Sequence, residues 1–328
     1  MIVSKTPLRA SFFGGGSDFA EYFRNNKYGY GTVLSTTVNM YVYITVLKKF
    51  DNKIRVCYSE NELVDRVEDI KHNLIREALK TTGVDHGVEI LYTADLPLGS
   101  AGVGLASSSA IAVGTLNALY AYQGIYASPE MLARKACEIE IGRLKHPIGI
   151  QDQYAVAYGG FRQYKFYRDG SVSAAPLICP PEILGELHSH LMLFYSGITR
   201  DSSKIMKEQN DTIHSKMPLF DSMVEEAEQA YKNLTYGKLD EWGYALDRVW
   251  EKKKKFASGV SKPLIEDMYC KAKNAGALGG KILGAGGGGF MMLYVPLEKQ
   301  LAVKEALKDF RQIDFSFEAA GSQIVFAE

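Results

Sequence analysis

The 328-residue sequence predicts an α+β protein with two domains. Strand-like segments rich in β-branched and aromatic residues dominate its first half, and long amphipathic helical patterns dominate its second half. A chain of this length can bury two separate cores. Three prolines, Pro176, Pro180 and Pro181, indicate a boundary between the halves. We therefore expect one domain over residues 1–181 and a second over residues 182–328.

Hydrophobic periodicity predicts the elements of the first half in order. We expect strands over residues 2–13, 34–47, 53–58, 88–93 and 161–166. We expect helices over residues 63–80, 108–122 and 129–143. After the last of these helices, Pro147 and Gly149 predict a turn that carries Asp152.

The second half is predicted to be mainly helical. It opens with a strand over residues 191–195. Amphipathic patterns then predict helices over residues 202–234, 239–256 and 263–275. A strand over 290–295, a helix over 297–310 and a strand over 324–326 complete the chain. The lysine run 252–255 is expected to form a solvated helix face.

Composition favours a cytoplasmic metabolic enzyme. Lys plus Arg and Asp plus Glu both number 38, so no net field attracts nucleic acid, and we expect no nucleic-acid partner. No apolar stretch approaches the roughly 18 residues that span a membrane, so no membrane association is expected. The four cysteines have no metal-ligand spacing, which argues against a zinc site and fits a reducing compartment.

A glycine-rich loop that runs into an apolar helix is the strongest functional signal. Glycines let backbone N–H groups converge on one point, and the helix N-terminus adds its positive dipole there. The loop lacks the lysine of a Walker A motif, and no acidic residue follows at the spacing of a Rossmann fingerprint. We predict a polyphosphate site that includes Gly99, Ser100, Gly102, Gly104, Leu105, Ala106, Ser107, Ser108 and Ser109.

Two further glycine runs lie near the ends of the chain. The first follows the N-terminal strand and consists of Gly14, Gly15 and Gly16, with Ser17 and Asp18 directly after it. Bare backbone beside a carboxylate that can accept from two adjacent hydroxyls suits a sugar. The second run, 286–289, is wedged between apolar residues, which favours close packing against another part of the site.

These three segments, in this order, resemble the GHMP kinase superfamily, and the resemblance covers essentially the whole chain. The pattern of Pro7, Arg9, Gly14 to Gly16 and Asp18 is most similar to the bacterial D-glycero-D-manno-heptose 7-phosphate kinase branch, as is the segment 195–200. The resemblance implies an N-terminal domain like ribosomal protein S5 and a ferredoxin-like C-terminal domain, with the site between them. It also implies ATP and Mg²⁺ as cofactors.

The resemblance also assigns roles to individual residues. Asp152 matches the family's catalytic aspartate, and Arg9 matches an arginine that lies beside it in some members. Glu140 and Ser108 match the magnesium ligands. A neighbouring arginine favours the charged form of a carboxylate. Whether Asp152 is a true base or orients the hydroxyl stays open, because phosphoryl transfer needs little activation of the nucleophile.

The phosphate loop departs from the family pattern. Pro97 and Ser107 are ten positions apart, three more than in the usual loop, and Ala106 stands where the family has glycine. The extra residues fall within 101–103. We expect the loop to bulge and to keep its anion-binding end.

The branch resemblance implies a substrate that already carries a phosphate, and therefore a second cationic pocket. Arg200 and Lys204 open a predicted helix and are candidates for it. Other predicted substrate contacts are Lys5, Arg9, Gly14, Gly15, Gly16, Ser17, Asp18, Gly286 and Gly287.

The reaction implied is phosphorylation of the anomeric hydroxyl of a heptose 7-phosphate. Two alternatives remain open. An anomeric kinase of an unphosphorylated sugar, of the galactose or fucose type, would share every motif except the second anion pocket. A sugar and ATP sensor on the same fold would bind without turnover. The sequence leaves a homodimer open.

Overall fold

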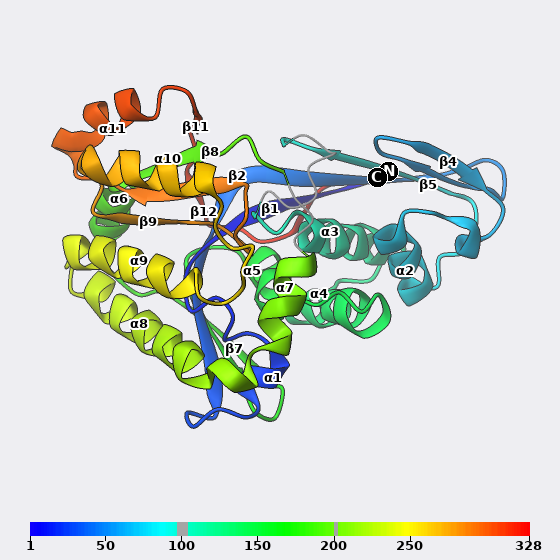
Figure 1. The fold of residues 1–328 in the computed structure, drawn as a ribbon. Coiled ribbons are helices and arrows are strands. Elements are labelled where there is room, and N and C mark those ends of the chain that lie inside the picture. The colour runs from blue at the N-terminus through cyan, green and yellow to red at the C-terminus, as the bar shows by residue number, and fades with distance from the viewer. Residues whose placement is uncertain (97–103, 200–202) are drawn as a thin grey trace.

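The computed structural model describes residues 1–96, 104–199 and 203–328, and two β-sheets organise them (Figure 1). The larger sheet has nine strands, and its main path runs β13-β1-β2-β5-β3-β4. β12 and β6 also pair with β2, and β7 pairs with β6. The strands are β1 Ile2–Phe13, β2 Tyr30–Lys48, β3 Ile54–Cys57, β4 Asn61–Val64, β5 Val88–Ala94, β6 Arg162–Tyr167, β7 Val172–Pro176, β12 Phe317–Glu318 and β13 Gln323–Ala327.

The smaller sheet has four antiparallel strands in the order β11-β8-β10-β9. Its strands are β8 Leu191–Tyr195, β9 Gly279–Ile282, β10 Phe290–Tyr294 and β11 Arg311–Ile313. Every residue of β9 and β10 is buried, so this sheet is a core layer. The mixed α/β fold with two sheets confirms the predicted fold class.

Helices cover both sheets. Those of the first half are α1 Ala20–Phe23, α2 Asn73–Thr82, α3 Ser107–Tyr122, α4 Pro129–Cys137 and α5 Gln151–Tyr158, with a π-helical segment Glu138–Arg143 after α4. Those of the second half are α6 Pro181–His190, α7 Ser203–Asp211, α8 Met217–Thr235, α9 Leu239–Lys253, α10 Pro263–Asn274 and α11 Gln300–Ala306. Single 3-10 turns occupy Val67–Asp69, His214–Lys216 and Leu297–Lys299.

α3 is the central helix of the first half. It is buried from Ser109 to Tyr120 without a polar face, and it packs against β1, β2, α2, α4 and α5. A helix that is apolar all round is stable only where neighbours cover every side. Its N-terminus is therefore held at a fixed place beside β1 and β2 (Figure 1).

The end of the chain returns to the larger sheet. β13 pairs with β1 and β12 pairs with β2, so the two termini lie side by side (Figure 1). The backbone N–H of Glu328 donates to the carbonyl of Met1 at 3.0 Å. The division into 1–181 and 182–328 stays a prediction, and these strands make the second segment continuous with the first.

Most predicted elements are present within a few residues, but several predictions are wrong. The helix predicted over 63–80 is instead β4, a 3-10 turn and α2, because the buried Glu62 carboxylate accepts from the backbone N–H groups of Lys71 and His72 and fixes a loop there. The helix predicted over 202–234 breaks between Asp211 and Met217. The lysine run is not simply solvated, since the Lys253 side chain is buried.

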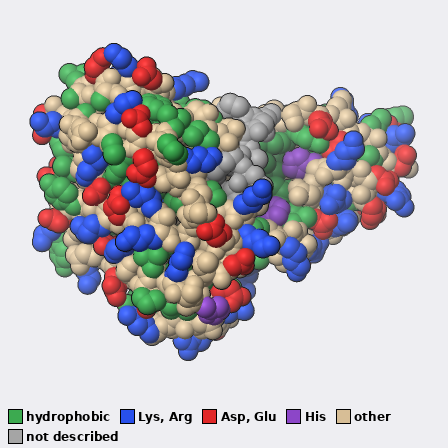
Figure 2. Space-filling model, viewed as in Figure 1, with side chains coloured by type: hydrophobic (Ala, Val, Ile, Leu, Met, Phe, Trp, Pro, Cys, Tyr) green, Lys and Arg blue, Asp and Glu red, His purple; other side chains and the backbone are tan. Residues whose placement is uncertain are grey.

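The described surface mixes both charges. Figure 2 shows Lys and Arg interspersed with Asp and Glu over the visible face, as the equal counts of the two signs predict. Among the described residues, no helix is long and apolar enough to cross a membrane.

Trp242 of α9 anchors the helices of the second half to β1. It is fully buried, and its ring meets Phe12 and Phe13 edge-on at centroid distances of 4.9 Å. Trp242→Ala should lower the free energy of unfolding by about 4 kcal/mol, because a large aromatic side chain leaves a cavity there. Denaturant unfolding measures this change.

Tyr244 on the same helix is the matched control, since it is 46% exposed. Tyr244→Ala should change the free energy of unfolding by less than about 0.5 kcal/mol. Equal losses in the two variants would contradict the anchoring role of Trp242.

Candidate active site

A cavity of about 290 Å³ lies where β1, the start of α3 and the segment after β9, with Gly284 and Ala285, meet. Residues from both halves of the chain line it. Its polar and charged lining residues include Arg9, Ser11, Asp18, Ser107, Ser108, His146, Gln151, Asp152, Gln209, Lys253 and Lys281. The cavity is therefore the place where the separate motifs of the sequence come together.

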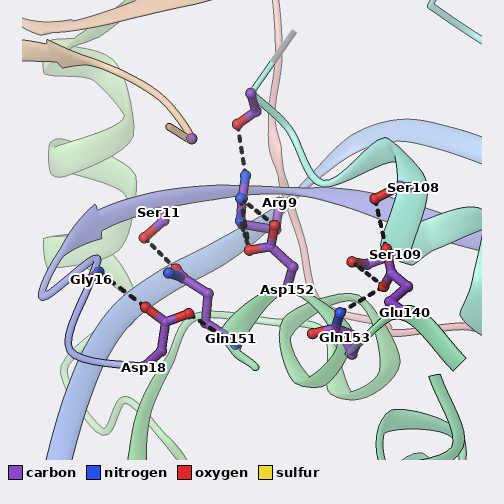
Figure 3. A network of polar contacts seen from close by, with 12 residues as sticks. Arg9, Ser11, Gly16, Asp18, Ser108, Ser109, Glu140, Gln151, Asp152 and Gln153 are labelled. Carbon is purple, nitrogen blue, oxygen red and sulfur yellow. Dashed lines mark hydrogen bonds and ion pairs between the residues drawn. The ribbon is translucent and has the colours of Figure 1, made fainter. Parts of the chain in front are cut away.

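Arg9 and Asp152 form a bidentate ion pair at the centre of the cavity wall (Figure 3). Nε and Nη2 of Arg9 donate to the two carboxylate oxygens of Asp152 at 2.8 and 2.7 Å. The Arg9 side chain is 4% exposed and that of Asp152 is 24% exposed. The carboxylate thus opens to the cavity, while the bidentate contact with the guanidinium fixes its plane.

Asp152 lies in the first turn of α5, which corrects the prediction of a turn at this position. The turn precedes it, at residues 146–150, and the buried Asp18 carboxylate holds that turn. Gln151 N–H donates to Oδ2 of Asp18 at 3.3 Å. A Cβ on Gly149 would lie 2.0 Å from the same oxygen, so only glycine allows this approach.

Asp18 is the second carboxylate of the cavity. Its Oδ1 accepts from the N–H of Gly16 at 3.0 Å. Burial, and then the charge of Asp152, raise the pKa of Asp18 above its usual value. Figure 3 shows Asp18 on one side of the Arg9–Asp152 pair and Glu140 on the other.

Glu140 lies in the π-helical segment and is fully buried, yet it touches the cavity through Ser108. Its Oε2 accepts from Ser109 Oγ at 2.8 Å and from Gln153 Nε2 at 2.6 Å. Its Oε1 accepts from Ser108 Oγ at 2.8 Å. Oε2 of Glu140 is therefore held by buried groups, whereas Oε1 faces the exposed Ser108.

The predicted phosphate loop is described from Gly104 onward, and Gly99, Ser100 and Gly102 lie outside the described residues. Ser107 and Ser108 begin α3 and line the cavity. Ala106 has φ +64°, a left-handed conformation that suits the glycine found there in the family. Leu105 is buried, and its carbonyl accepts from Arg9 N–H at 3.1 Å.

Gly284, two residues before the glycine run 286–289, packs directly on this loop. A Cβ on Gly284 would lie 2.6 Å from Cα of Gly104, and a Cβ on Gly104 would lie 2.4 Å from the carbonyl oxygen of Leu283. The backbones of these two segments therefore touch. Gly284 and Ala285 line the cavity.

Several predicted substrate residues lie outside the cavity lining. The Lys5 ammonium lies 3.7 Å from the centre of the Tyr41 ring. Ser17 donates to the carbonyls of Gly14 and Thr32. Gly287 N–H donates to the carbonyl of Val260 at 2.6 Å, and a Cβ on Gly286 would meet the same turn. None of these four residues lines the cavity.

The predicted second anion pocket is described only in part. Lys204 is exposed at the start of α7 and does not line the cavity, whereas Ser203, Met206 and Gln209 of the same helix do. Gly15 and Gly16 also line it. Arg200 lies outside the described residues.

Several polar residues of the site were not predicted from the sequence. Gln151 and Gln153 flank Asp152, and Ser11 donates to Gln151 Oε1 at 2.9 Å. Lys253 donates to the carbonyls of Ile282 and Gly284. Lys281 of β9 donates to the carbonyls of Ser11 and Phe12 at 2.8 and 2.9 Å. The available signal for Lys281 was a single charge in an apolar segment directly before the glycine run.

Comparison with known proteins identifies the family. The models of the GHMP kinases N terminal domain and the GHMP kinases C terminal domain match residues 69–160 and 220–312. A D-glycero-alpha-D-manno-heptose 7-phosphate kinase of Campylobacter jejuni is 31% identical, over 98% of this chain and 97% of that protein. A mevalonate kinase of Thermococcus sibiricus is 29% identical over 75% and 70%.

Solved structures agree. A crystal structure described as a D-glycero-D-manno-heptose 1-phosphate kinase, from Bacteroides thetaiotaomicron, superposes with a TM-score of 0.82 at 25% identity and covers 100% of both chains. The two family models follow one another in order, and the heptose kinase aligns over nearly the whole length. The chain therefore belongs to the GHMP kinases and is an ATP-dependent kinase.

Proposed function

We propose that this kinase transfers the γ-phosphoryl group of ATP to the anomeric hydroxyl of D-glycero-D-manno-heptose 7-phosphate, giving the 1,7-bisphosphate and ADP. The observation that carries the proposal is the Arg9–Asp152 ion pair, which opens onto the same cavity as Asp18 and the start of α3. The full-length similarity to a heptose 7-phosphate kinase supports the choice of sugar.

In the proposed reaction, the acceptor hydroxyl oxygen forms a bond to the γ-phosphorus. The bond from that phosphorus to the bridging oxygen of ADP breaks, and its electron pair stays on ADP. The hydroxyl proton passes to the carboxylate of Asp152, which Arg9 holds in place. Because the transition state is loose, the main contribution of Asp152 is to orient the hydroxyl and receive its proton.

Asp18 is proposed to bind the sugar itself. A carboxylate can accept from two neighbouring hydroxyls, and Asp18 already has a fixed plane because Gly16 and Gln151 donate to it. The 7-phosphate is proposed to bind near the start of α7, with Arg200 and Lys204 as its partners.

Mg²⁺ is proposed to bind Ser108 and Glu140. Magnesium takes oxygen ligands at 2.0–2.1 Å in octahedral geometry, so two adjacent ligands lie about 2.9 Å apart. Ser108 Oγ and Glu140 Oε1 are 2.8 Å apart, which fits that spacing. When bound, the ion would neutralise phosphate charge. The described residues hold no cluster of three metal-ligating side chains, so phosphates and water would complete the shell.

A panel of acceptors tests the substrate. ADP release with MgATP should occur with D-glycero-D-manno-heptose 7-phosphate and be at least about a hundredfold slower with mannose, galactose, fucose, mannose 6-phosphate and mevalonate. D-glycero-D-manno-heptose 1-phosphate belongs in the panel, because one similar structure carries that name.

Asp152→Asn is the control for the panel. It should lower kcat by about 10²-fold or more while ATP affinity stays nearly unchanged, since Asp152 acts on the acceptor. Turnover confined to a free hexose, or to mevalonate, would contradict the proposed substrate and identify that acceptor in its place.

The serines at the start of α3 test the metal site. Ser108→Ala should raise the Mg²⁺ concentration for half-maximal activity about tenfold, because a proposed ligand is lost. Ser109→Ala is the matched control, since Ser109 is buried and bonds the other oxygen of Glu140. An unchanged magnesium titration in Ser108→Ala, beside a shifted one in Ser109→Ala, would contradict the assignment.

A further inference from the structure

Lys281 is a buried cation in the cavity wall that the proposed chemistry does not yet use. It lies on β9, at the bottom of the cavity, and is 2% exposed. Its ammonium donates to the carbonyls of Ser11 and Phe12 on β1. Arg9, which holds Asp152, is two residues before Ser11 on that strand. Lys281, Arg9 and Asp152 therefore meet near the same end of β1.

No carboxylate of the described residues lies within ion-pair distance of Lys281. A buried ammonium without a counter-ion is unfavourable, and such groups are concentrated at functional sites. Burial, and then the charge of Arg9, lower the pKa of Lys281 to about 7. An anion bound beside it would relieve both effects.

The ammonium has a donor to offer such an anion. It carries three N–H groups, and the two carbonyls of β1 accept from two of them. Among the described residues, the other charged or titratable side chains that line the cavity are Arg9, Asp18, His146, Asp152 and Lys253. Arg9 is committed to Asp152, and Lys253 holds the carbonyls of Ile282 and Gly284.

We propose that Lys281 binds the phosphoryl group that ATP transfers, and so supplies from β9 the cation that the glycine-rich phosphate loop lacks. Gly284 follows Lys281 by three residues and packs on Gly104, just before α3. This contact brings the lysine from the second half of the chain to the start of α3. In a Walker A motif the corresponding lysine lies within the loop. This inference rests on the proposed ATP site.

Direct nucleotide binding to the intact protein tests the proposal. In Lys281→Met, the Kd of a non-hydrolysable ATP analogue should rise at least tenfold, while that of ADP should change less than threefold. The matched control is Lys273→Met: Lys273 on α10 also donates to a backbone carbonyl near β9, that of Leu278, but lies outside the cavity lining. It should leave both constants unchanged.

Equal changes for the two nucleotides, or no change in either, would overturn the proposal and leave Lys281 as a link between β9 and β1. If the wild-type protein bound neither nucleotide, the proposed ATP site would fail, and the inference with it. The two failures are distinguishable, because the wild-type protein binds both nucleotides if only the role of Lys281 is wrong and binds neither if the ATP site itself is wrong.

If Lys281→Met does not fold, calorimetry on the wild-type protein decides. At pH 8 a lysine with a pKa of about 7 is mostly neutral, and an adjacent phosphoryl group raises that pKa, so binding takes up a proton. Titrations in two buffers of different ionisation enthalpy should show greater proton uptake for the ATP analogue than for ADP. Equal uptake would overturn the proposal.

Discussion

The guanidinium of Arg9 joins the parts of the active site. From one buried side chain on β1 it donates to both oxygens of Asp152 on α5 and, at 2.7 Å, to the carbonyl of Gly104 at the entrance to α3. Gly104 in turn packs on Gly284 of the second half. The proposed acceptor side, the proposed phosphate side and the C-terminal half therefore share one fixed point, and a shift in any of them would move the carboxylate.

The sequence alone predicts those helices and strands whose ends depend on neighbouring residues. β1 has the predicted ends, 2 and 13, because a long apolar strand stops where three glycines follow. α3 begins at the serines because glycines precede it and its residues are apolar on every side. The resemblance to GHMP kinases pointed to Arg9 and Asp152, and the structure brings them together over 143 residues of sequence.

Features set by contacts between distant segments could not be predicted. Glu62 replaces the first part of the helix predicted over 63–80 with a loop, because its carboxylate accepts from backbone N–H groups nine and ten residues later. Lys253 looks like one of four equivalent lysines, and only the fold turns it inward to the carbonyls of the glycine run. The Lys281 side chain reaches the carbonyls of Ser11 and Phe12 on β1, a contact between distant segments that no pattern within β9 indicates.

The central claim is that Arg9 and Asp152 act as a unit, and a double-mutant cycle on kcat tests it most directly. Asp152→Asn and Arg9→Met should each lower kcat by about 10²-fold or more, and the double variant should be little slower than Asp152→Asn alone, because residues that act together are not additive. Losses that multiply in the double variant would mean that the two residues work independently, and would contradict the account.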